Sequence, residues 1–511
     1  MPEHRAAALS ELADDKPHLV ELDGTKVVLI RRGGTVHALA GLCPHKKVPL
    51  DKGIVAGDTI VCGVHRAAFR LDTGEVTRPP ACENLARYQV RIDAGTVHVT
   101  IPEDHEAHPI PAMAAKRGTN RHFAIVGAGA AGWRAAETLR REGFGGRITV
   151  ITDEKAQPYD RTDLSKSYLG PDEPDDVTIR TKEQADEAGI EIVHATVLAL
   201  DPKAKTLTLK NGTERTLAFD RALIATGAAA NVPDMAGTDL DGVHTLRSLS
   251  DAKALRGSLN GASRAVIVGG GFIGFEAAAA LSKRDGLDVT LVVREAVPFE
   301  KQFGTAFGNR LVQEHRDAGV TVLTGTRTQC IEGEGAVEGV VVPGRTLPAD
   351  IVILATGARP RTDWLPFETG DDGAVAVNEG LAVEGCRDIF AAGDIARVPT
   401  PWGKVRIEHW RFAQECGEVA ARSMLGQDAR YDGTPFFWTM QQIAGSYTYT
   451  GHADGWDEMD GDVLRKDFAA SLMQHGKVAA VLAHGIMDAV TATEPRMAGR
   501  GPLPREEAPP V

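Results

Sequence analysis

Short runs of β-branched and apolar residues mark the first hundred positions of the chain. Runs at 27–30, 35–39 and 96–100 are rich in Val, Ile, Leu and Thr and lie next to Asp-Gly, Gly-Gly and Ala-Gly pairs. Such runs between turn residues predict β-strands. Because the strands are short and closely spaced, we expect a small all-β domain over residues 1–103.

The pattern changes after residue 103. From 104 to 120 the chain is rich in Pro, His, Ala and charged residues without periodicity, which is typical of a linker. Beyond it, apolar strands alternate with helical stretches. This alternation predicts a parallel sheet with crossover helices.

The part of the chain after the linker contains a repeat. Each copy starts with an apolar strand, at 123–126 and at 265–268, which leads into a Gly-x-Gly-x-x-Gly segment and an Ala-rich helical stretch. Each copy later has a strand that ends in Ala-Thr-Gly, at 225–227 and at 355–357. The repeat indicates two similar α/β modules. From about Pro435, aromatic and alternating segments predict a compact α+β module.

Composition excludes several classes of protein. The 511 residues are 43% hydrophobic and 25% charged, which is typical of globular domains. A net charge of -13 argues against a nucleic-acid binder. No run approaches the roughly 18 apolar residues of a membrane helix, and the N-terminus lacks the apolar stretch of a secretory signal. Six cysteines are too few for a disulfide framework. We therefore expect a cytoplasmic enzyme that contacts neither nucleic acid nor membrane.

The strongest chemical signal is a pair of Cys/His groups in the N-terminal domain. Cys43 and His45 are followed, after sixteen residues, by Cys62 and His65. In a Rieske [2Fe–2S] centre two cysteines hold one iron and two histidines hold the other. A structural zinc site uses the same ligand types and is the alternative. The β-rich context favours a Rieske cluster.

Residues 1 to about 100 resemble the Rieske ferredoxin family. Besides the Cys/His pairs, the segment 69–75 and Arg78-Pro79-Pro80 carry the resemblance. Val64 and Arg66 depart from it, because relatives usually have an aromatic residue and a Gly there. The cysteine pair that bridges the two loops in high-potential respiratory Rieske proteins is missing. The resemblance therefore implies the lower-potential, ferredoxin-like type.

Further polar and sulfur groups lie in the same domain. Lys46, Lys47 and Arg66 are expected either to raise the reduction potential or to attract an acidic partner, and a solvated loop face is the alternative. Cys82 is distant from both pairs, and we expect it to be a buried small hydrophobic residue.

The two glycine-rich segments predict two dinucleotide sites. Both follow an apolar strand and open a helix, which is the context this motif requires. The glycines allow close backbone approach, and the helix N-terminus receives the pyrophosphate. Two sites in one chain indicate FAD together with a nicotinamide cofactor, the usual pair for hydride exchange. The expected contacts are Gly127, Gly129 and Gly132 in the first module and Gly269, Gly271, Gly274 and Gly357 in the second.

The residues at the end of the next strand differ between the modules. In the first module Asp153 and Glu154 suit a ribose diol. In the second, the strand ends at Val293, and Arg294 and Glu295 follow. Arg294 favours NADPH, whereas a ribose held by Glu295 or by a backbone group favours NADH. The sequence leaves the choice of nicotinamide cofactor open. The preference for NADH rests only on what is usual among the related proteins named below.

The segment 158–166 resembles ferredoxin reductases and apoptosis-inducing-factor-like flavoproteins, although Thr162-Asp163 replace the usual two prolines. The resemblance continues at 390–394, 406–414 and 435–439 and covers nearly the whole chain, from Asp14 to about Ala498. Together with the N-terminal domain, these segments make the chain similar to the apoptosis-inducing-factor-like flavoproteins that carry a Rieske domain. The resemblance implies FAD contacts from Arg161, Lys166 and Asp394, a nicotinamide contact from Glu276, and an isoalloxazine lined by Trp410 and Trp438. The candidate catalytic residues are Lys166, Glu276 and Trp410.

The resemblance implies a multidomain fold: an all-β Rieske domain, then a glutathione-reductase-like pair of Rossmann domains, and a small α+β C-terminal domain. We expect these parts to be a Rieske domain at 1–103, a linker at 104–120, an FAD-binding domain at 121–250 and 376–433, an NAD(P)-binding domain at 251–375, a C-terminal interface domain at 434–500 and a disordered tail at 501–511.

The predicted function is NAD(P)H oxidation with electron transfer. The disulfide reductases of this superfamily carry a Cys-x₄-Cys pair, and this chain has none. We therefore expect hydride transfer to FAD and single-electron transfer through the cluster to an acceptor that the sequence does not identify, a redox protein or a small molecule. One alternative is direct reduction of a quinone or a small organic radical, with the cluster as a sensor. Another is a redox-dependent signalling protein. The sequence leaves the oligomeric state open, a homodimer included.

Overall fold

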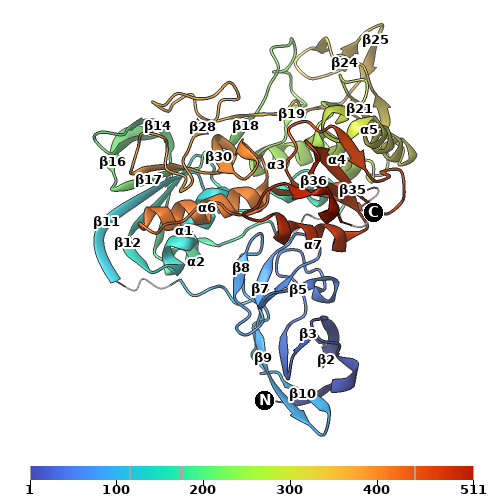
Figure 1. The fold of residues 1–511 in the computed structure, drawn as a ribbon. Coiled ribbons are helices and arrows are strands. Elements are labelled where there is room, and N and C mark those ends of the chain that lie inside the picture. The colour runs from blue at the N-terminus through green and yellow to red at the C-terminus, as the bar shows by residue number, and fades with distance from the viewer. Residues whose placement is uncertain are drawn as a thin grey trace. The chain divides into compact units, whose positions relative to one another are not determined.

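The structure is a computed structural model that describes residues 2–113, 117–172, 174, 176–441, 443 and 445–509. Contacts divide the chain, traced by colour in Figure 1, into two units. Unit 1 consists of Met1–Gly118, Leu139–Gly145 and Met487–Pro495. Unit 2 consists of Thr119–Thr138, Gly146–Ile486 and Arg496–Val511.

Unit 1 contains an all-β domain, as predicted. A six-stranded antiparallel sheet has the order β1-β10-β9-β4-β3-β2, and a four-stranded sheet has the order β5-β6-β7-β8. The first sheet consists of β1 (Glu3–Ala8), β2 (His18–Leu22), β3 (Thr25–Arg32), β4 (Thr35–Ala40), β9 (Arg87–Asp93) and β10 (Thr96–Thr100). The second consists of β5 (Ile54–Ala56), β6 (Thr59–Val61), β7 (Ala68–Arg70) and β8 (Val76–Arg78).

The chain stays on this domain for several residues after β10. The backbone N–H of Ala86 donates to the carbonyl of Ala107, and that of Asn84 donates to the carbonyl of Pro109, both at 2.9 Å. The linker predicted over 104–120 therefore begins with a stretch that belongs to unit 1. Its residues 114–116 lie outside the described residues, and β11 already begins at Arg117.

Unit 2 contains two α/β modules whose sheets share the same order of four strands; the fifth strand, β29 or β19, follows the other four in sequence in the first module and precedes them in the second. The sheet of the first module runs β13-β12-β11-β17-β29, and that of the second runs β19-β26-β20-β21-β22. The pairs β11–β17, β12–β13, β17–β29, β20–β26 and β20–β21 are parallel. In each sheet the strand that precedes the glycine-rich turn, β11 or β20, lies where the strand order reverses. Ligands bind at such switch points, outside the carboxyl ends of the strands.

The elements of the two modules have the following bounds. The first module has β11 (Arg117–Val126), α1 (Ala130–Arg141), β12 (Phe144–Thr152), α2 (Lys182–Glu187), β13 (Ile190–His194), β17 (Arg221–Ile224), β29 (Ile389–Ala391) and α6 (Trp410–Met424). The second has β19 (Val243–Thr245), α3 (Leu249–Ser258), β20 (Arg264–Val268), α4 (Phe272–Leu281), β21 (Asp288–Val292), α5 (Glu300–Asp317), β22 (Thr321–Leu323) and β26 (Ile351–Leu354).

Short strands, most of them antiparallel, complete both modules. The segments after the two Ala-Thr-Gly sequences pair with each other, as β18 (Ala228–Ala230) and β27 (Ala358–Pro360). The remaining small sheets consist of β14 (Thr196–Asp201), β15 (Thr206–Asn211) and β16 (Thr213–Ala218); β23 (Cys330–Glu332), β24 (Gly339–Val342) and β25 (Arg345–Pro348); and β28 (Val375–Ala376), β30 (Ala396–Thr400) and β31 (Gly403–Val405).

The C-terminal part contains the predicted α+β module. Its sheet runs β32-β33-β36-β35-β34, and β37 pairs with β36. The tail that was expected to be disordered from Gly501 therefore contains a strand, since its backbone pairs with the first residues of β36, the central strand of this sheet. The elements are β32 (Phe436–Gln441), β33 (Gly445–Gly451), β34 (Glu458–Asp460), β35 (Phe468–Gln474), β36 (Lys477–His484), α7 (Met487–Met497) and β37 (Leu503–Pro504).

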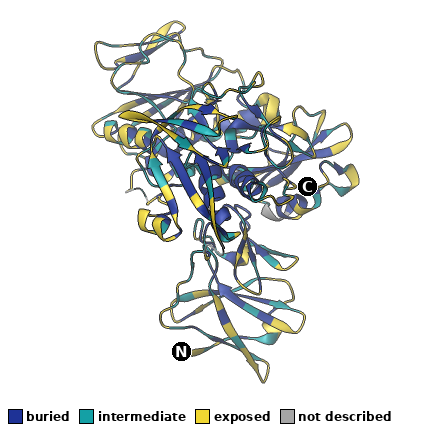
Figure 2. Ribbon diagram, turned by 90° about the vertical axis from the view of Figure 1, so that its left-hand side faces the viewer, coloured by how far each residue is buried: buried dark blue, intermediate teal, exposed yellow. Residues whose placement is uncertain are grey.

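Helix α4 lies in the core of unit 2. Every residue from Gly274 to Leu281 is buried, because four alanines in a row let neighbouring elements approach closely. Figure 2 shows buried residues in dark blue along the strands of the sheets. The core around α4 includes Phe275, Phe303 and Tyr449. Among the described residues, no helix is long and apolar enough to cross a membrane.

Candidate functional site

The two Cys/His loops of unit 1 share one backbone conformation. The N–H of Lys47 donates to the carbonyl of Cys43 at 2.8 Å, and the N–H of Arg66 donates to the carbonyl of Cys62 at 3.2 Å. Lys47 and Arg66 have φ values of 53° and 68°, in the left-handed region. Each loop therefore reverses its direction four residues after its cysteine. This reversal brings the predicted ligand side chains of the two loops close together.

The predicted ligand atoms lie in pairs. The Nδ1 atoms of His45 and His65 are 3.0 Å apart, and the thiols of Cys43 and Cys62 hydrogen-bond to each other. Among the described residues, His, Cys, Asp and Glu form no group of three or more that could hold a single metal ion. Two sulfurs in one pair and two ring nitrogens in the other fit a Rieske [2Fe–2S] cluster, in which each iron takes one pair, better than a zinc ion.

Both cysteine sulfurs accept hydrogen bonds from backbone N–H groups two and three residues further along their loops. The Cys43 thiol and these N–H groups lower the pKa of Cys62 to about 7 against the effect of burial. Metal ligands must be thiolates. The thiol of Cys62 and burial raise the pKa of Cys43, so it is the backbone N–H groups of the two loops that favour the thiolate form at both positions.

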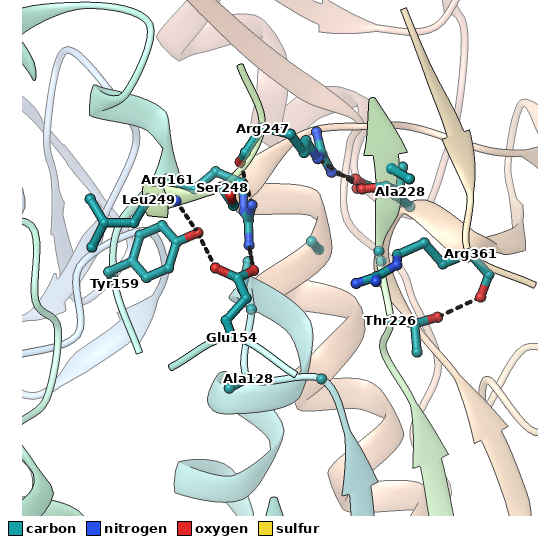
Figure 3. Close-up of a pocket in the computed structure, with 18 of the residues that line it drawn as sticks. Ala128, Glu154, Tyr159, Arg161, Thr226, Ala228, Arg247, Ser248, Leu249 and Arg361 are labelled. Carbon is teal, nitrogen blue, oxygen red and sulfur yellow. Dashed lines mark hydrogen bonds and ion pairs between the residues drawn. The ribbon is translucent and has the colours of Figure 1, made fainter. Parts of the chain in front are cut away.

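Unit 2 contains a cavity of about 1160 Å³. It extends from the turn after β11 to the N-termini of α4 and α6 and to strand β32. Ligand pockets typically have volumes of roughly 300–1000 Å³, so this one is large enough for a dinucleotide. Figure 3 shows part of its lining.

The three glycines after β11 have different surroundings. A Cβ on Gly127 (φ 110°) would lie 2.2 Å from the carbonyl oxygen of Ala225, and one on Gly132 would lie 1.9 Å from that of Gly127. At Gly129 a Cβ would meet nothing within 4 Å. The outer two glycines therefore allow close packing of strand and helix, and the middle one leaves space at the cavity for a pyrophosphate.

The second module repeats this arrangement. A Cβ on Gly269 (φ 128°) would lie 2.1 Å from the carbonyl oxygen of Ala355, and one on Gly274 would lie 2.1 Å from that of Gly269. Gly271 has open space around its Cβ position. The same local geometry is therefore present for a second dinucleotide.

Glu154 and Arg161, both expected at the FAD site, form an ion pair at 2.9 Å (Figure 3). The Tyr159 hydroxyl donates to the other Glu154 oxygen at 2.6 Å and accepts from the N–H of Leu249 at 3.0 Å. Burial raises the pKa of Tyr159, so its hydroxyl keeps the proton it donates. The carboxylate is therefore held in place at the end of β12, where a ribose is expected.

Two arginines that the sequence analysis did not select hold the other acids of this cavity. Arg247 pairs with Asp394, and Arg361 pairs with Asp153 at 2.6 Å. Both arginines lie in the group shown in Figure 3. Arg247 is fixed by the capping box of α3, since the carboxylate of Asp251, the third residue of that helix, accepts from its backbone N–H at 3.0 Å. Neither arginine belongs to a recognisable motif.

Lys166 and Glu276 form a buried ion pair at 2.9 Å, with 8% and 3% of their surfaces exposed. Ser165 donates to one Glu276 oxygen at 2.6 Å, and Thr439 donates to the other at 2.8 Å. The pair joins the loop after β12, helix α4 and strand β32. The sequence analysis had selected Lys166 and Glu276 but neither hydroxyl, although Ser165 precedes Lys166 directly.

Trp410 and Trp438 line the same cavity. His409 lines it too; its Nε2 accepts the backbone N–H of Trp438 at 3.3 Å, and its ring meets the Trp438 indole edge-on at 4.3 Å. Burial, together with the positive charges of Arg411 and Lys166, lowers the pKa of His409 well below its usual value. The imidazole is therefore neutral. It was missed in the sequence analysis, although it is adjacent to Trp410.

Apart from Glu276, the predicted contacts of the second module lie outside the lining of this cavity. They follow the carboxyl ends of β20, β21 and β26 and are Gly269, Gly271, Gly274, Arg294 and Gly357. The Arg294 side chain is 71% exposed and pairs with Glu295 at 2.9 Å. The binding roles of these residues stay predictions.

Comparisons with known proteins agree with this geometry. Residues 121–417 match the family described as pyridine nucleotide-disulphide oxidoreductase, and residues 3–89 match the Rieske [2Fe–2S] domain. The chain is 32% identical over 494 residues to Apoptosis-inducing factor 3 of Mus musculus, covering 93% of this chain and 80% of that protein.

A bacterial relative and a solved structure cover mainly the flavoprotein part. The biphenyl dioxygenase system ferredoxin--NAD(+) reductase component of Paraburkholderia xenovorans (strain LB400) is 36% identical over 356 residues, 68% of this chain and 84% of that protein. The covalent putidaredoxin reductase–putidaredoxin complex is similar in structure with a TM-score of 0.70 and 27% identity, over 75% of this chain and 94% of that chain.

These matches confirm the predicted cofactors, which are FAD, NAD(P)H and a [2Fe–2S] cluster. They also confirm an NAD(P)H-dependent flavin oxidoreductase of the ferredoxin-reductase type. The chain therefore belongs to the pyridine nucleotide-disulphide oxidoreductase family and carries a Rieske [2Fe–2S] domain in its N-terminal part.

Proposed function

We propose that this chain oxidises NAD(P)H and passes the electrons singly, through its Rieske cluster, to a redox-protein acceptor. The observation that carries the proposal is the position of the cysteines. No cysteine is among the described residues that line the cavity of unit 2, so a dithiol beside the flavin is missing. The same chain carries a Rieske domain with a complete set of predicted ligands, which offers a one-electron outlet.

Bound FAD supplies hydride acceptance and single-electron release, and the cluster carries one electron at a time. The chain's own residues bind and orient. Gly129 and the N-terminus of α1 offer N–H groups and space for the pyrophosphate. Glu154, held by Tyr159 and Arg161, offers a fixed carboxylate for the ribose diol.

The inner end of the cavity combines paired charge with aromatic surface. The Lys166–Glu276 pair lies at the N-terminal part of α4, where the nicotinamide ring is expected. Trp410, Trp438 and the neutral His409 line the same cavity, where their aromatic surface would limit the access of water. Excluding water protects a reduced centre from side reactions.

We propose NADH as the preferred donor. The exposed Arg294 guanidinium is engaged by Glu295, which reduces its availability for a 2′-phosphate. Relatives of this chain are named ferredoxin--NAD(+) reductases. Their names also support an acceptor of the ferredoxin class.

A cluster-free variant tests the route. We expect Cys43→Ala to lose iron and to lose reduction of an added ferredoxin, while NADH still bleaches the flavin in stopped-flow absorbance measurements. Cys82→Ala is the matched control: Cys82 is buried and is not a predicted ligand, so it should keep iron and both activities. Full acceptor turnover in Cys43→Ala would instead support direct reduction of the acceptor, such as a quinone, by the flavin.

The order of events provides a second test. In wild-type protein mixed with NADH, flavin bleaching should precede the change in the cluster spectrum. A cluster that stays oxidised over many flavin turnovers would exclude the route.

A further inference from the structure

The segment that follows β10 is attached firmly to the Rieske domain. This strap, residues 102–109, is hydrogen-bonded to the domain through the carbonyls of Ala107 and Pro109, on either side of His108. His105, earlier in the strap, packs edge-on against Tyr88 with ring centroids 5.5 Å apart. The backbone of His108 therefore has a defined position.

The His108 imidazole contacts both ends of the first cluster-binding loop. Its Nε2 is 2.9 Å from the carbonyl oxygen of Leu42, and its Nδ1 is 3.1 Å from Nζ of Lys47. A carbonyl only accepts and an ammonium group only donates. The ring is therefore neutral, with its proton on Nε2, donating to Leu42 and accepting from Lys47.

The surroundings of His108 support the neutral form. Burial is the main cause that lowers its pKa, and the charge of Lys47 lowers it further, against the opposite effect of Glu83 and Glu106. A neutral imidazole at pH 7 leaves Nδ1 free to accept from the ammonium group. A protonated ring would have no acceptor and would repel Lys47.

The position of Lys47 gives this contact a consequence for the cluster. Lys47 is two residues after the ligand His45, and its backbone N–H donates to the carbonyl of the ligand Cys43. The ammonium group of an unrestrained lysine samples many positions in solvent. A lysine held by a second side chain keeps its charge beside the loop. A positive charge near an iron–sulfur cluster favours the reduced, more negative state and raises its potential.

We propose that His108 is a positioning residue that holds the Lys47 ammonium group at the first cluster-binding loop and thereby raises the reduction potential of the Rieske cluster. Ligands and backbone N–H groups set the main part of that potential. The strap adds a contribution to the reduction potential from outside the two loops. The Lys47 charge therefore acts on the cluster only while His108 is in place.

The test is a redox titration of the cluster in the full-length protein, followed by electron paramagnetic resonance, on a set of four proteins. His108→Leu and Lys47→Gln should each shift the midpoint potential downward, and the double variant should shift no further than Lys47→Gln alone. Additive shifts in the double variant, or an unchanged potential in His108→Leu, would overturn the proposal.

Two further variants separate positioning from stability. His108→Gln should retain most of the wild-type potential, because its amide can donate to Leu42 and accept from Lys47. His105→Gln changes the same strap without a contact to the loop and should leave the potential unchanged. A downward shift in His105→Gln as large as that in His108→Leu would show that the strap acts through general loosening and would refute the specific role of His108. If His108→Leu fails to bind iron, the comparison of His108→Gln with Lys47→Gln decides: equal downward shifts in both would also refute it.

Discussion

The Lys166–Glu276 pair shows how single residues control the cavity. Removing two charges from water has a large cost, which only good geometry and further hydrogen bonds offset. Here Ser165 and Thr439 each donate to Glu276, and the carbonyl of Thr162 accepts from Lys166 at 2.7 Å. The Lys166 and Glu276 charges are therefore each compensated only while the other is present.

We expect Glu276→Leu to destabilise unit 2 by about 3–5 kcal/mol, because it leaves the buried Lys166 charge without its carboxylate. Adding Lys166→Met should recover most of this loss, since the pair is then replaced by apolar side chains of similar size. Thermal and denaturant unfolding, followed by flavin fluorescence, measures both. A double variant that is less stable than the single variant would contradict this account of the pair.

The Arg294–Glu295 pair governs the choice of nicotinamide cofactor in our proposal. Glu295→Ala should release Arg294 for a 2′-phosphate and raise the ratio of kcat/KM for NADPH to that for NADH by about tenfold, the equivalent of about 1.4 kcal/mol or one charged hydrogen bond. The measurement is steady-state reduction of an artificial electron acceptor with each cofactor. The gain should disappear in Arg294→Ala/Glu295→Ala. A gain that persists there would assign the effect to another residue.

At the scale of elements, the strand–turn–helix units after β11 and β20 repeat the same packing. In both, the first and third glycines contact backbone carbonyls and the second faces open space. The glycine pattern in the sequence therefore reflects two separate requirements, close backbone packing and open space. Two positions serve the packing of the fold, and one leaves open space where a ligand is predicted.

This difference predicts opposite results for two neighbouring substitutions. Gly132→Ala forces a Cβ against the carbonyl of Gly127 and should destabilise the protein by about 1–3 kcal/mol. Gly129→Ala should leave circular dichroism and the unfolding midpoint of the flavin-free protein unchanged but weaken FAD binding, measured by fluorescence titration. Gly271→Ala and Gly274→Ala should repeat this difference for NADH. Equal loss of fold in Gly129→Ala would show that all three glycines are structural.

Elements were predicted from the sequence with uneven success. The strands at 27–30, 123–126 and 265–268 were recognised because apolar runs next to Gly-rich turns have a local cause. The strap and the strand β37 were not, since both are polar, Pro-containing segments that become ordered only by hydrogen-bonding to backbone elsewhere in the chain, a loop for the strap and β36 for β37. Periodicity contains no information about such docking.

At the scale of the whole molecule, the two cofactor types belong to different units. All four predicted iron ligands lie in unit 1, and the residues that line the large cavity lie in unit 2. A bound group stabilises the structure that binds it and leaves other parts of the chain unaffected.

We therefore expect differential scanning calorimetry to separate the effects of the two cofactors. Cys43→Ala, which removes iron, should lower the transition of unit 1 and leave that of unit 2 in place, because structural metal binding contributes to folding. Removal of FAD should do the reverse. One transition that shifts equally in both preparations would mean that the units unfold together.

The sequence by itself determined the cofactors and the reaction class. The Cys/His pairs and the glycine-rich turns are local, with a few residues between their members, so their geometry follows from short-range backbone constraints. The absence of a Cys-x₄-Cys pair could be recognised from the sequence in the same way. These features were enough to predict FAD, NAD(P)H and a Rieske cluster.

Only the tertiary structure decided which side chains hold these groups in place. Arg247 reaches Asp394 across 147 positions, Thr439 reaches Glu276 across 163, and Arg361 reaches Asp153 across 208. His108 reaches Lys47 across 61. Such contacts depend on how distant segments pack, and an arginine or a histidine without a motif carries no local sign of its partner.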